Sequence, residues 1–303
     1  MSESSRQQWR AVFDISITFS NGGGLRSEGF RVDLPAEQAD ADTVAKLFIR
    51  QLGLTMVDSA DVSNLRVIQE AHKNPVGAAE PQGGRRRLVE LSHVIRDGLV
   101  TYPGLPAPRI GDHLGWEASH ATYGPGTEFQ IGRIDMVANT GTYVDTPAHR
   151  HRDGADLSGV GLDRLADLPG LLVRVSGTAS RAIDAALFAP FDLAGRAVLI
   201  ETGWSRHFGT EAYGSGHPYL TEAAARWLVE QGAALVGIDS LNIDDSADPA
   251  RPVHTVLLGA GIPVVEHLCR LDQLPVDGFR FTAAPPMVEG MGTFPVRAFA
   301  AIE

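Results

Sequence analysis

Cysteine is nearly absent from this chain, because Cys269 is the only one among its 303 residues. A single thiol excludes an intrachain disulfide and fits a reducing compartment. It follows the segment Val264-Val-Glu-His-Leu268, whose apolar residues are typical of a core. We therefore interpret Cys269 as a small buried hydrophobic residue.

Positive charge is also scarce. The chain has 26 Lys and Arg against 37 Asp and Glu, which gives a formal net charge of −11 and a pI near 5.4. Nucleic-acid-binding domains present a basic face, so this balance argues against a nucleic-acid partner. We interpret the only dense basic run, Arg85-Arg-Arg87, as a solvated connector.

Long apolar runs are missing as well. None reaches the roughly 18–20 residues of a membrane span, and residues 1–8 lack the apolar segment of a signal peptide. There is no Ser in a Gly-x-Ser-x-Gly frame. Neither Gly124-Pro-Gly126 nor Gly290-Met-Gly292 has the strand–loop–helix context of a nucleotide-binding loop. We expect a cytoplasmic protein with no membrane partner and no nucleotide cofactor.

The N-terminal part of the chain predicts a small α+β module. Alternating apolar and polar side chains predict strands at residues 10–20 and 30–34, joined by a Gly-rich turn. A helix is expected next, with Asp40 or Asp42 as its cap. Residues 65–72 fit a strand or a helix.

A stretch rich in Pro, Gly and Ala follows and has the composition of a linker. We divide the chain into a module at residues 1–75, a linker at 76–87 and a larger segment at 88–303. In this segment Thr221 is a candidate cap for a helix, and a second, short helix is expected to begin at Val256. Predicted strands lie at residues 171–175, 197–201, 235–239, 263–265, 279–283 and 296–300.

The run Asn139-Thr-Gly-Thr-Tyr-Val-Asp-Thr-Pro-Ala-His149 combines a Gly turn, a carboxylate, a Pro and an imidazole. A strand-like apolar segment at 134–138 precedes it, and polar groups on a turn at a strand end are typical of functional sites. Asp145 and His149 are close enough in the chain to share a metal ion or to form an acid–base pair. Asp and His near a turn more often form hydrogen bonds only to the local backbone. Residues elsewhere in the chain must therefore show whether this pair belongs to a functional site.

Further polar residues follow apolar strands later in the chain. Asp239-Ser-Leu-Asn-Ile-Asp-Asp245 ends one predicted strand, and Glu266 ends another. Strand ends are where α/β proteins gather functional groups. Glu266 needs a partner, a metal or a surface position, because an unpaired buried carboxylate is very costly.

Taken together, these motifs resemble the cyclase superfamily, which includes kynurenine formamidases and isatin hydrolases. The 139–149 run is similar to its signature H-x-G-T-H-x-D-x-P-x-H, and His254 in Pro252-Val-His254 stands twelve residues before Glu266, as in the family. The resemblance covers residues 88–303. Further matching pieces occur in family order: Leu91-Ser-His93, Tyr102-Pro-Gly104, Pro218-Tyr-Leu220, Gly237-Ile-Asp239 and Pro295-Val-Arg297.

The resemblance implies an α/β (α+β) fold, namely a swivelling β/β/α domain around a mixed barrel-like sheet. It implies Asp145, His254 and Glu266 as metal ligands and His149 as general acid/base. Tyr102 stands where formamidases tend to have a substrate-contacting Trp. Family members usually form homodimers or higher homo-oligomers, with pockets near subunit contacts, and we expect the same here.

The chain departs from the family signature at two positions. Asn139 and Tyr143 replace the two His that, with the bridging Asp, hold one ion. An amide oxygen is a weak ligand for zinc, and a phenol with an ordinary pKa of about 10 binds a metal only when forced to ionise. We therefore expect at most one divalent ion, Zn²⁺ or Mn²⁺. Tyr143 becomes a candidate catalytic residue and Asn139 a candidate substrate contact.

Two more candidates for substrate binding lie outside these runs. His217 either lines the pocket or only orders the loop before the helix at Thr221. Trp204, which follows the strand at 197–201, is either a pocket wall or ordinary aromatic packing.

Three functions remain open from the sequence. The one we favour is a metal-dependent hydrolase, similar to an arylformamidase, that acts on an amide, lactam or lactone of a small aromatic or carbonyl compound. The second is a metal-free cyclase, lyase or dehydratase of a biosynthetic pathway, with Asp145, His149, Tyr143 and Glu266 as an acid–base set. The third is a non-catalytic binding or assembly protein.

Overall fold

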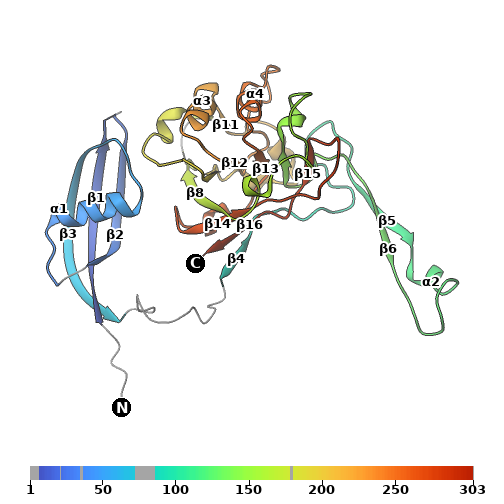
Figure 1. Ribbon diagram of the computed structural model, residues 1–303, viewed down its shortest axis with the longest axis horizontal. Helices are drawn as coiled ribbons and strands as arrows, with labels where there is room; N and C mark the ends of the chain where they lie inside the picture. Colours follow the sequence, from blue (N-terminus) through green and yellow to red (C-terminus); the bar gives the residue numbers. More distant parts are fainter. Residues whose placement is uncertain (1–6, 21, 35–36, 72–85, 178–179, 303) are drawn as a thin grey trace, which may run out of the picture. The chain divides into compact units, whose positions relative to one another are not determined.

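The computed structural model describes residues 7–20, 22–34, 37–71, 86–177 and 180–302 (Figure 1). The chain divides into two compact units, residues 1–86 with 185–192 and residues 87–184 with 193–303. Of the linker predicted at 76–87, only Arg86 and Arg87 are among the described residues. The boundaries at 75 and 88 therefore stay a prediction.

The N-terminal unit contains a three-stranded antiparallel sheet and one helix. The strands are β1 (Gln7–Phe19), β2 (Gly24–Leu34) and β3 (Val57–Ala71), in the order β2-β1-β3, with α1 at Ala41–Gln51. Alternation along β1 turns Phe13 and its like-facing neighbours onto Phe48 of α1, and both rings are buried. Residues 65–71, which the sequence left between strand and helix, belong to β3.

The second unit is built on a curled, mixed, nine-stranded sheet, in the order β15-β7-β13-β12-β10-β8-β14-β16-β4. The neighbouring strands β8, β10, β12 and β13 run parallel, and the other pairings are antiparallel. These bounds apply: β4 Arg87–Glu90, β7 Tyr143–Asp145, β8 Leu168–Arg174, β10 Ala197–Glu201, β12 Leu235–Ile238, β13 Val264–Glu266, β14 Phe279–Thr282, β15 Thr293–Pro295 and β16 Phe299–Ile302.

Two helices pack on each other beside this sheet, α3 (Glu222–Glu230) and α4 (Pro252–Gly259). Thr221 caps α3 as predicted, because its hydroxyl accepts from the amide of Ala224. Two short strands, β9 (Ala182–Ile183) and β11 (Tyr219–Leu220), form a separate parallel pair. The mixed sheet and its helices confirm the predicted fold class.

Several predicted boundaries were wrong. The strand expected at 134–138 is the end of β6, which stops at Asp135. Of the strand expected at 296–300, only residues 299–300 belong to a strand, β16; the preceding strand, β15, ends at Pro295, which has no backbone donor. The helix expected from Val256 begins one turn earlier at Pro252, because Pro is well suited to a first helical turn.

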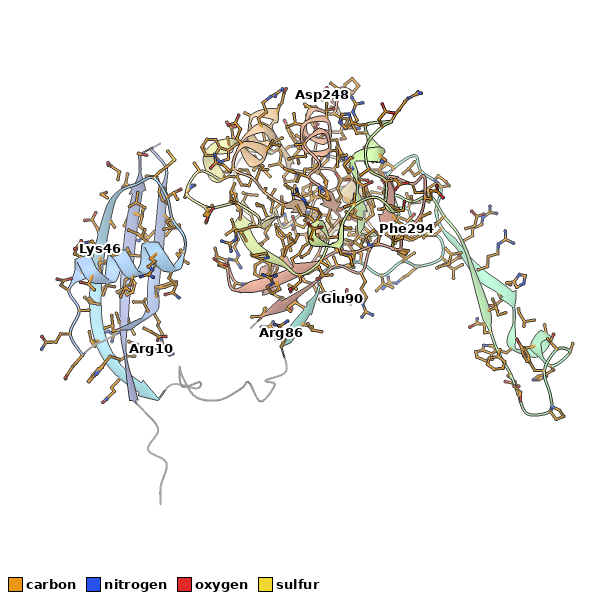
Figure 2. The ribbon with its side chains drawn as sticks, viewed as in Figure 1. Arg10, Lys46, Arg86, Glu90, Asp248 and Phe294 are labelled. Carbon is orange, nitrogen blue, oxygen red and sulfur yellow. The ribbon has the colours of Figure 1, made fainter. Side chains whose placement is uncertain are left out.

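A long hairpin arm leaves the sheet of the second unit. It consists of β5 (Arg109–Leu114), the short helix α2 (Trp116–Ser119) and β6 (Ile131–Asp135), and the two strands pair only with each other. Figure 2 shows its side chains projecting outward, in contrast to the dense packing around the nine-stranded sheet. The exposed apolar side chains of this arm are Ile110, Trp116, Phe129, Ile131 and Ile134.

No helix in the described ranges has the length and apolar character needed to cross a membrane.

Candidate active site

Strand register brings four polar side chains together. Strand β7 lies between β13 and β15, and Tyr143 is the cross-strand partner of Glu266. Asp145, two residues on and therefore on the same face, is the partner of Thr293 in β15. All four side chains are buried. The sheet therefore holds two carboxylates and two hydroxyls rigidly beside each other.

His149 reaches this cluster from a single turn of 3-10 helix, η1 (Pro147–His149), directly after β7. Thr293 connects it to Asp145, because the Thr293 hydroxyl donates to Asp145 Oδ1 and lies 2.7 Å from His149 Nδ1. A hydroxyl has one proton, so Thr293 accepts from His149 Nδ1–H. In the neutral form of the ring, Nε2 would then carry the lone pair that a base or a metal ligand requires.

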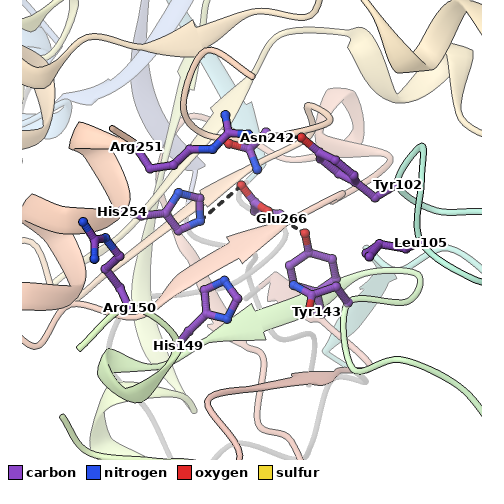
Figure 3. A pocket seen from close by; sticks show the side chains of 10 residues that line it. Tyr102, Leu105, Tyr143, His149, Arg150, Asn242, Arg251, His254 and Glu266 are labelled. Atoms are coloured by element: carbon purple, nitrogen blue, oxygen red, sulfur yellow. Dashed lines mark hydrogen bonds and ion pairs between the residues drawn. The ribbon is translucent and has the colours of Figure 1, made fainter. Parts of the chain in front are cut away.

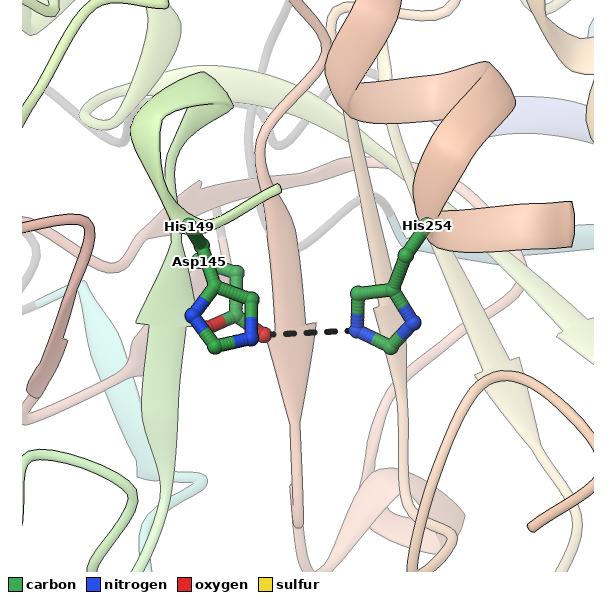
Figure 4. A group of neighbouring side chains, drawn as sticks. All are labelled: Asp145, His149 and His254. Carbon is green, nitrogen blue, oxygen red and sulfur yellow. Dashed lines mark ion pairs between the residues drawn. The ribbon is translucent and has the colours of Figure 1, made fainter. Parts of the chain in front are cut away.

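His254 approaches from the opposite side, on the first turn of α4. Asp244 fixes it twice, by accepting from its backbone amide at 3.1 Å and by bonding its Nδ1 at 2.6 Å. This contact turns Nε2 toward the carboxylates. It lies 3.5 Å from Asp145 Oδ2 (Figure 4) and 3.7 Å from Glu266 Oε1. A carboxylate behind the ring is the usual way of orienting a catalytic or metal-binding His.

Three side chains of this cluster have pKa values far from their usual ones. Burial by itself would lower the pKa of His254, but its hydrogen bonds to Asp145 and Asp244 and the charge of Glu266 raise it to about 10. Burial raises the pKa of Glu266 to about 7, against the opposing effect of His254. Burial, together with the neighbouring Glu266 and Asp145 charges, raises the pKa of Tyr143 well above its usual value. The Tyr143 phenol therefore keeps its proton.

A cavity of about 310 Å³ opens onto these groups (Figure 3). Its walls include six residues predicted from the sequence, namely Tyr102, Asn139, Tyr143, His149, His254 and Glu266. Asp145 lies behind them, fully buried. The sequence did not point to four more lining residues: Leu105, Arg150, Asn242 and Arg251.

The structure places His217 and Trp204 outside the lining of this cavity. The ring of His217 is buried, with Nδ1 at 3.1 Å from the backbone oxygen of Pro218 in its own loop and Nε2 at 3.1 Å from Ser246 Oγ. This position corresponds to the loop-ordering alternative. The indole of Trp204 donates to the backbone oxygen of Tyr213 at 3.1 Å, which corresponds to the packing alternative.

The donor set fits one divalent cation. Asp145 Oδ2 is buried, and its contact with His254 Nε2, at 3.5 Å, is too long for a good hydrogen bond. A cation held between the two atoms would satisfy this oxygen, which is otherwise costly to bury. Ligand atoms of Asp145, His149 and His254 lie within 4.8 Å of one another. Glu266 completes the set less directly, since its oxygens already accept from the Ile243 amide and the Tyr143 hydroxyl.

The chain belongs to the Cyclase family, described as "Putative cyclase", whose pattern matches residues 89–245. A kynurenine formamidase of Erythrobacter litoralis is 26% identical over 201 residues, which cover 66% of this chain and 87% of that protein. The match therefore confirms the family that the motifs resemble, and with it an enzyme fold.

Solved structures agree. Isatin hydrolase A of Ralstonia solanacearum is 25% identical, with a TM-score of 0.62, and the match covers 73% of this chain and 93% of that one. A structure titled as a potential metal-dependent hydrolase with cyclase activity is 26% identical, with a TM-score of 0.58, over 71% of this chain and 96% of that one.

Proposed function

We propose that this protein is a hydrolase of an amide, lactam or lactone in a small aromatic or carbonyl compound. The observation that supports it most is the cluster of Asp145, His149 and His254 at the floor of a cavity large enough for such a molecule. The names of its relatives, kynurenine formamidase and isatin hydrolase, support the same reaction class.

The hydrogen bonds support a role for each of these residues. His149 presents Nε2 to the cavity and is the general acid/base, oriented through Thr293. His254 is held by Asp244 and, with Asp145 and Glu266, would hold one Zn²⁺ or Mn²⁺ ion. Such an ion, when bound, lowers the pKa of water and polarises a carbonyl oxygen.

Two guanidinium groups favour a substrate with an anionic substituent. Arg150 and Arg251 both line the cavity, and both are attached to the start of α4. Arg150 Nε donates to Thr255 Oγ1 at 3.0 Å, and Arg251 Nη1 donates to the Asp245 backbone oxygen at 2.7 Å. No ion pair to a carboxylate is found for either guanidinium within the described ranges, so a substrate carboxylate would meet both.

A metal-free cyclase, lyase or dehydratase remains the second candidate. The observation that favours it is the hydrogen bond from Tyr143 to Glu266, which leaves an ordered set of proton donors and acceptors in the cavity without any ion.

We also propose that the chain forms a homodimer or a higher homo-oligomer through the hairpin arm. A two-stranded hairpin is marginal by itself in water, and this one exposes Trp116, Phe129, Ile131 and Ile134. A second copy of the chain is the partner that would cover them.

The test is metal analysis of the purified protein combined with hydrolysis assays. Aryl formamides, lactams and aryl lactones would be offered in pairs with and without a carboxylate. We expect at most one bound ion per chain and hydrolysis that a chelator abolishes, with the carboxylate-bearing members preferred. Two stoichiometric ions, or no hydrolysis of any compound by the metal-loaded protein, would contradict the proposal. Hydrolysis that survives complete metal removal would favour the second candidate.

A further inference from the structure

A chain of three buried side chains ends on Glu266. The Tyr143 hydroxyl donates to Glu266 Oε2 at 2.7 Å. His267 Nε2 lies 3.2 Å from the same hydroxyl, and His267 Nδ1 lies 2.8 Å from the hydroxyl of Tyr213. The three side chains are almost inaccessible to solvent, with relative exposures of 2% for Tyr143, 0% for His267 and 3% for Tyr213.

The direction of these hydrogen bonds is determined by proton counting. Tyr143 has one hydroxyl proton and gives it to Glu266, so it must accept from His267 Nε2–H. A charged imidazolium bonded only to two phenols would be costly in this buried position, so the ring is neutral and has a single proton. Nδ1 is then an acceptor, and Tyr213 donates to it. All three bonds point toward Glu266.

The backbone of His267 has an uncommon conformation. Its φ angle is +57°, in the left-handed region that few residues other than Gly adopt. Such conformations cost free energy and persist where the surrounding structure requires them. Here the backbone oxygen of His267 accepts from Thr142 Oγ1 at 2.6 Å, which holds the turn after β13. This turn is what directs the ring back under Tyr143.

We propose that Tyr213, His267 and Tyr143, three uncharged side chains, form a one-directional relay of hydrogen bonds that positions the Glu266 carboxylate. Tyr143 stands at one of the two positions where the family signature has a metal-binding His. The relay thus supplies, by hydrogen bonds, the anchoring of Glu266 that a neighbouring cation would otherwise provide. Oε1 of Glu266 is left directed toward His254 Nε2 and the single ion of the proposed function, on which this consequence rests.

The first experiment reads the relay without any metal or substrate. Long-range ¹H–¹⁵N correlation spectra of protein labelled on histidine report which ring nitrogen carries the proton, and a His267→Asn variant assigns the signal. Asn is chosen because it tolerates a left-handed backbone. We expect His267 to be neutral and protonated on Nε2. A ring protonated on Nδ1, or on both nitrogens, would overturn the relay.

The second experiment measures positioning by the affinity for Zn²⁺ alone, in calorimetric titrations. Removing groups that orient ligands typically weakens metal affinity about 10- to 100-fold, and we expect this range for Tyr143→Phe and for His267→Asn. Tyr213→Phe removes one distant hydroxyl and should give a smaller decrease. Tyr219→Phe, whose ring packs against Arg181 outside the relay, is the matched control and should bind Zn²⁺ as the wild type does.

The outcomes separate the two proposals. Unchanged Zn²⁺ affinity in both Tyr143→Phe and His267→Asn would contradict a positioning role. A wild-type protein that binds no Zn²⁺ would contradict the metal site of the proposed function, and the tautomer of His267 would then decide the relay by itself.

Discussion

At the scale of single residues, the site depends on side chains that are connected to a buried carboxylate and also face the cavity. His149 is the clearest case, since it is 36% exposed on its side chain while Asp145, four residues earlier, is fully buried. It can meet a substrate while remaining tied to the interior through Thr293.

The first prediction concerns His149→Ala. Loss of a positioned general acid/base lowers turnover by about 10²–10⁴-fold, so we expect at least a 100-fold decrease in kcat. The measurement is steady-state kinetics on whichever aryl amide or lactam the wild type hydrolyses. His151→Ala is the control, because the ring of His151 lies outside the cavity lining, with Nε2 at 3.2 Å from the backbone oxygen of Thr255. This variant should keep most of the turnover. Equal losses in both variants would mean that the turn, not the imidazole, matters.

The second prediction concerns Thr293, whose hydroxyl serves Asp145 and His149 at once. Thr293→Val keeps the shape and removes the hydroxyl, which leaves a buried carboxylate oxygen and an imidazole without their partner. We expect about 1–3 kcal/mol lower stability and a clear decrease in kcat. Thr293→Ser should restore both in urea unfolding and kinetic measurements. Failure of the Ser variant to restore kcat would refute the bridging role.

The third prediction is a pH dependence at His93, whose ring stacks on Phe208 with 3.6 Å between centroids. Burial, assisted by the Arg270 charge, lowers the pKa of His93 to about 4 from its usual 6.5. Because the unfolded chain binds this proton more readily, stability is complete above pH 6.5 and is lost as the pH falls toward 4.

The measurement is the free energy of unfolding in urea at pH 7 and pH 5. His93→Phe keeps a ring for stacking but cannot titrate. We expect the wild type to lose about 2 kcal/mol more than the variant over this interval. An identical loss in both proteins would show that His93 is not buried as a neutral ring.

At the scale of secondary-structure elements, the site is formed where five elements meet, namely β7, β13, β15, η1 and α4. Close backbone approach between two of these elements is made possible by Gly292, because a Cβ atom there would overlap the backbone of Ala148 and His149. The Gly292 carbonyl also accepts from the Thr146 amide at 2.7 Å. This glycine therefore determines how closely η1 and the strand β15 lie.

The fourth prediction follows from that contact. Gly292→Ala should displace η1 and with it His149, so kcat should fall and stability should decrease by about 1–3 kcal/mol, as for other overpacked sites. Gly111→Ala, in the arm, is the matched control, since nothing lies within 4 Å of a Cβ atom there. Thermal unfolding and kinetics of both variants provide the test, and a Gly292→Ala protein with normal kcat would contradict it.

The elements also show which parts of the site a sequence can reveal. Asp145, His149, His254 and Glu266 could be found because they stand at strand ends or in a motif of fixed spacing. Thr293 could not, since its role depends on the register between β7 and β15, which no local pattern encodes. Arg251 was missed for a similar reason: its left-handed backbone at the start of α4, with φ of +48°, aims it at the cavity.

In the fold, too, some elements could be predicted from the sequence and others could not. The apolar runs of β8, β10 and β12 predicted strands. The structure explains why these runs are so apolar, since the three strands run parallel and such strands are covered on both faces. The hairpin arm was not predicted, since Arg, Asp and His interrupt β5 and leave no clean alternation. Its strands are defined by pairing with each other and not by burial.

At the scale of the whole molecule, the apolar side chains of the hairpin arm would be exposed to solvent in a monomer. The fifth prediction is that Ile131→Lys combined with Ile134→Lys converts an oligomer into monomers, because charge at an apolar contact is costly to bury. Sedimentation velocity of wild type and variant measures the change. Arg109→Lys, on the same arm, should leave the oligomer intact. A wild type that sediments as a monomer would refute the proposed assembly.

Cys269 lies two residues beyond His267, and it is the one thiol of the chain. Its amide donates to the Leu91 backbone oxygen at 2.9 Å, and burial raises the pKa of the thiol to about 11. A thiol reagent should therefore react slowly while this segment is folded and faster when it opens. Cys269 can therefore serve as a built-in reporter of local unfolding. Its rate of modification by a thiol reagent, measured with and without a bound inhibitor, would report how often the segment that contains Glu266 opens.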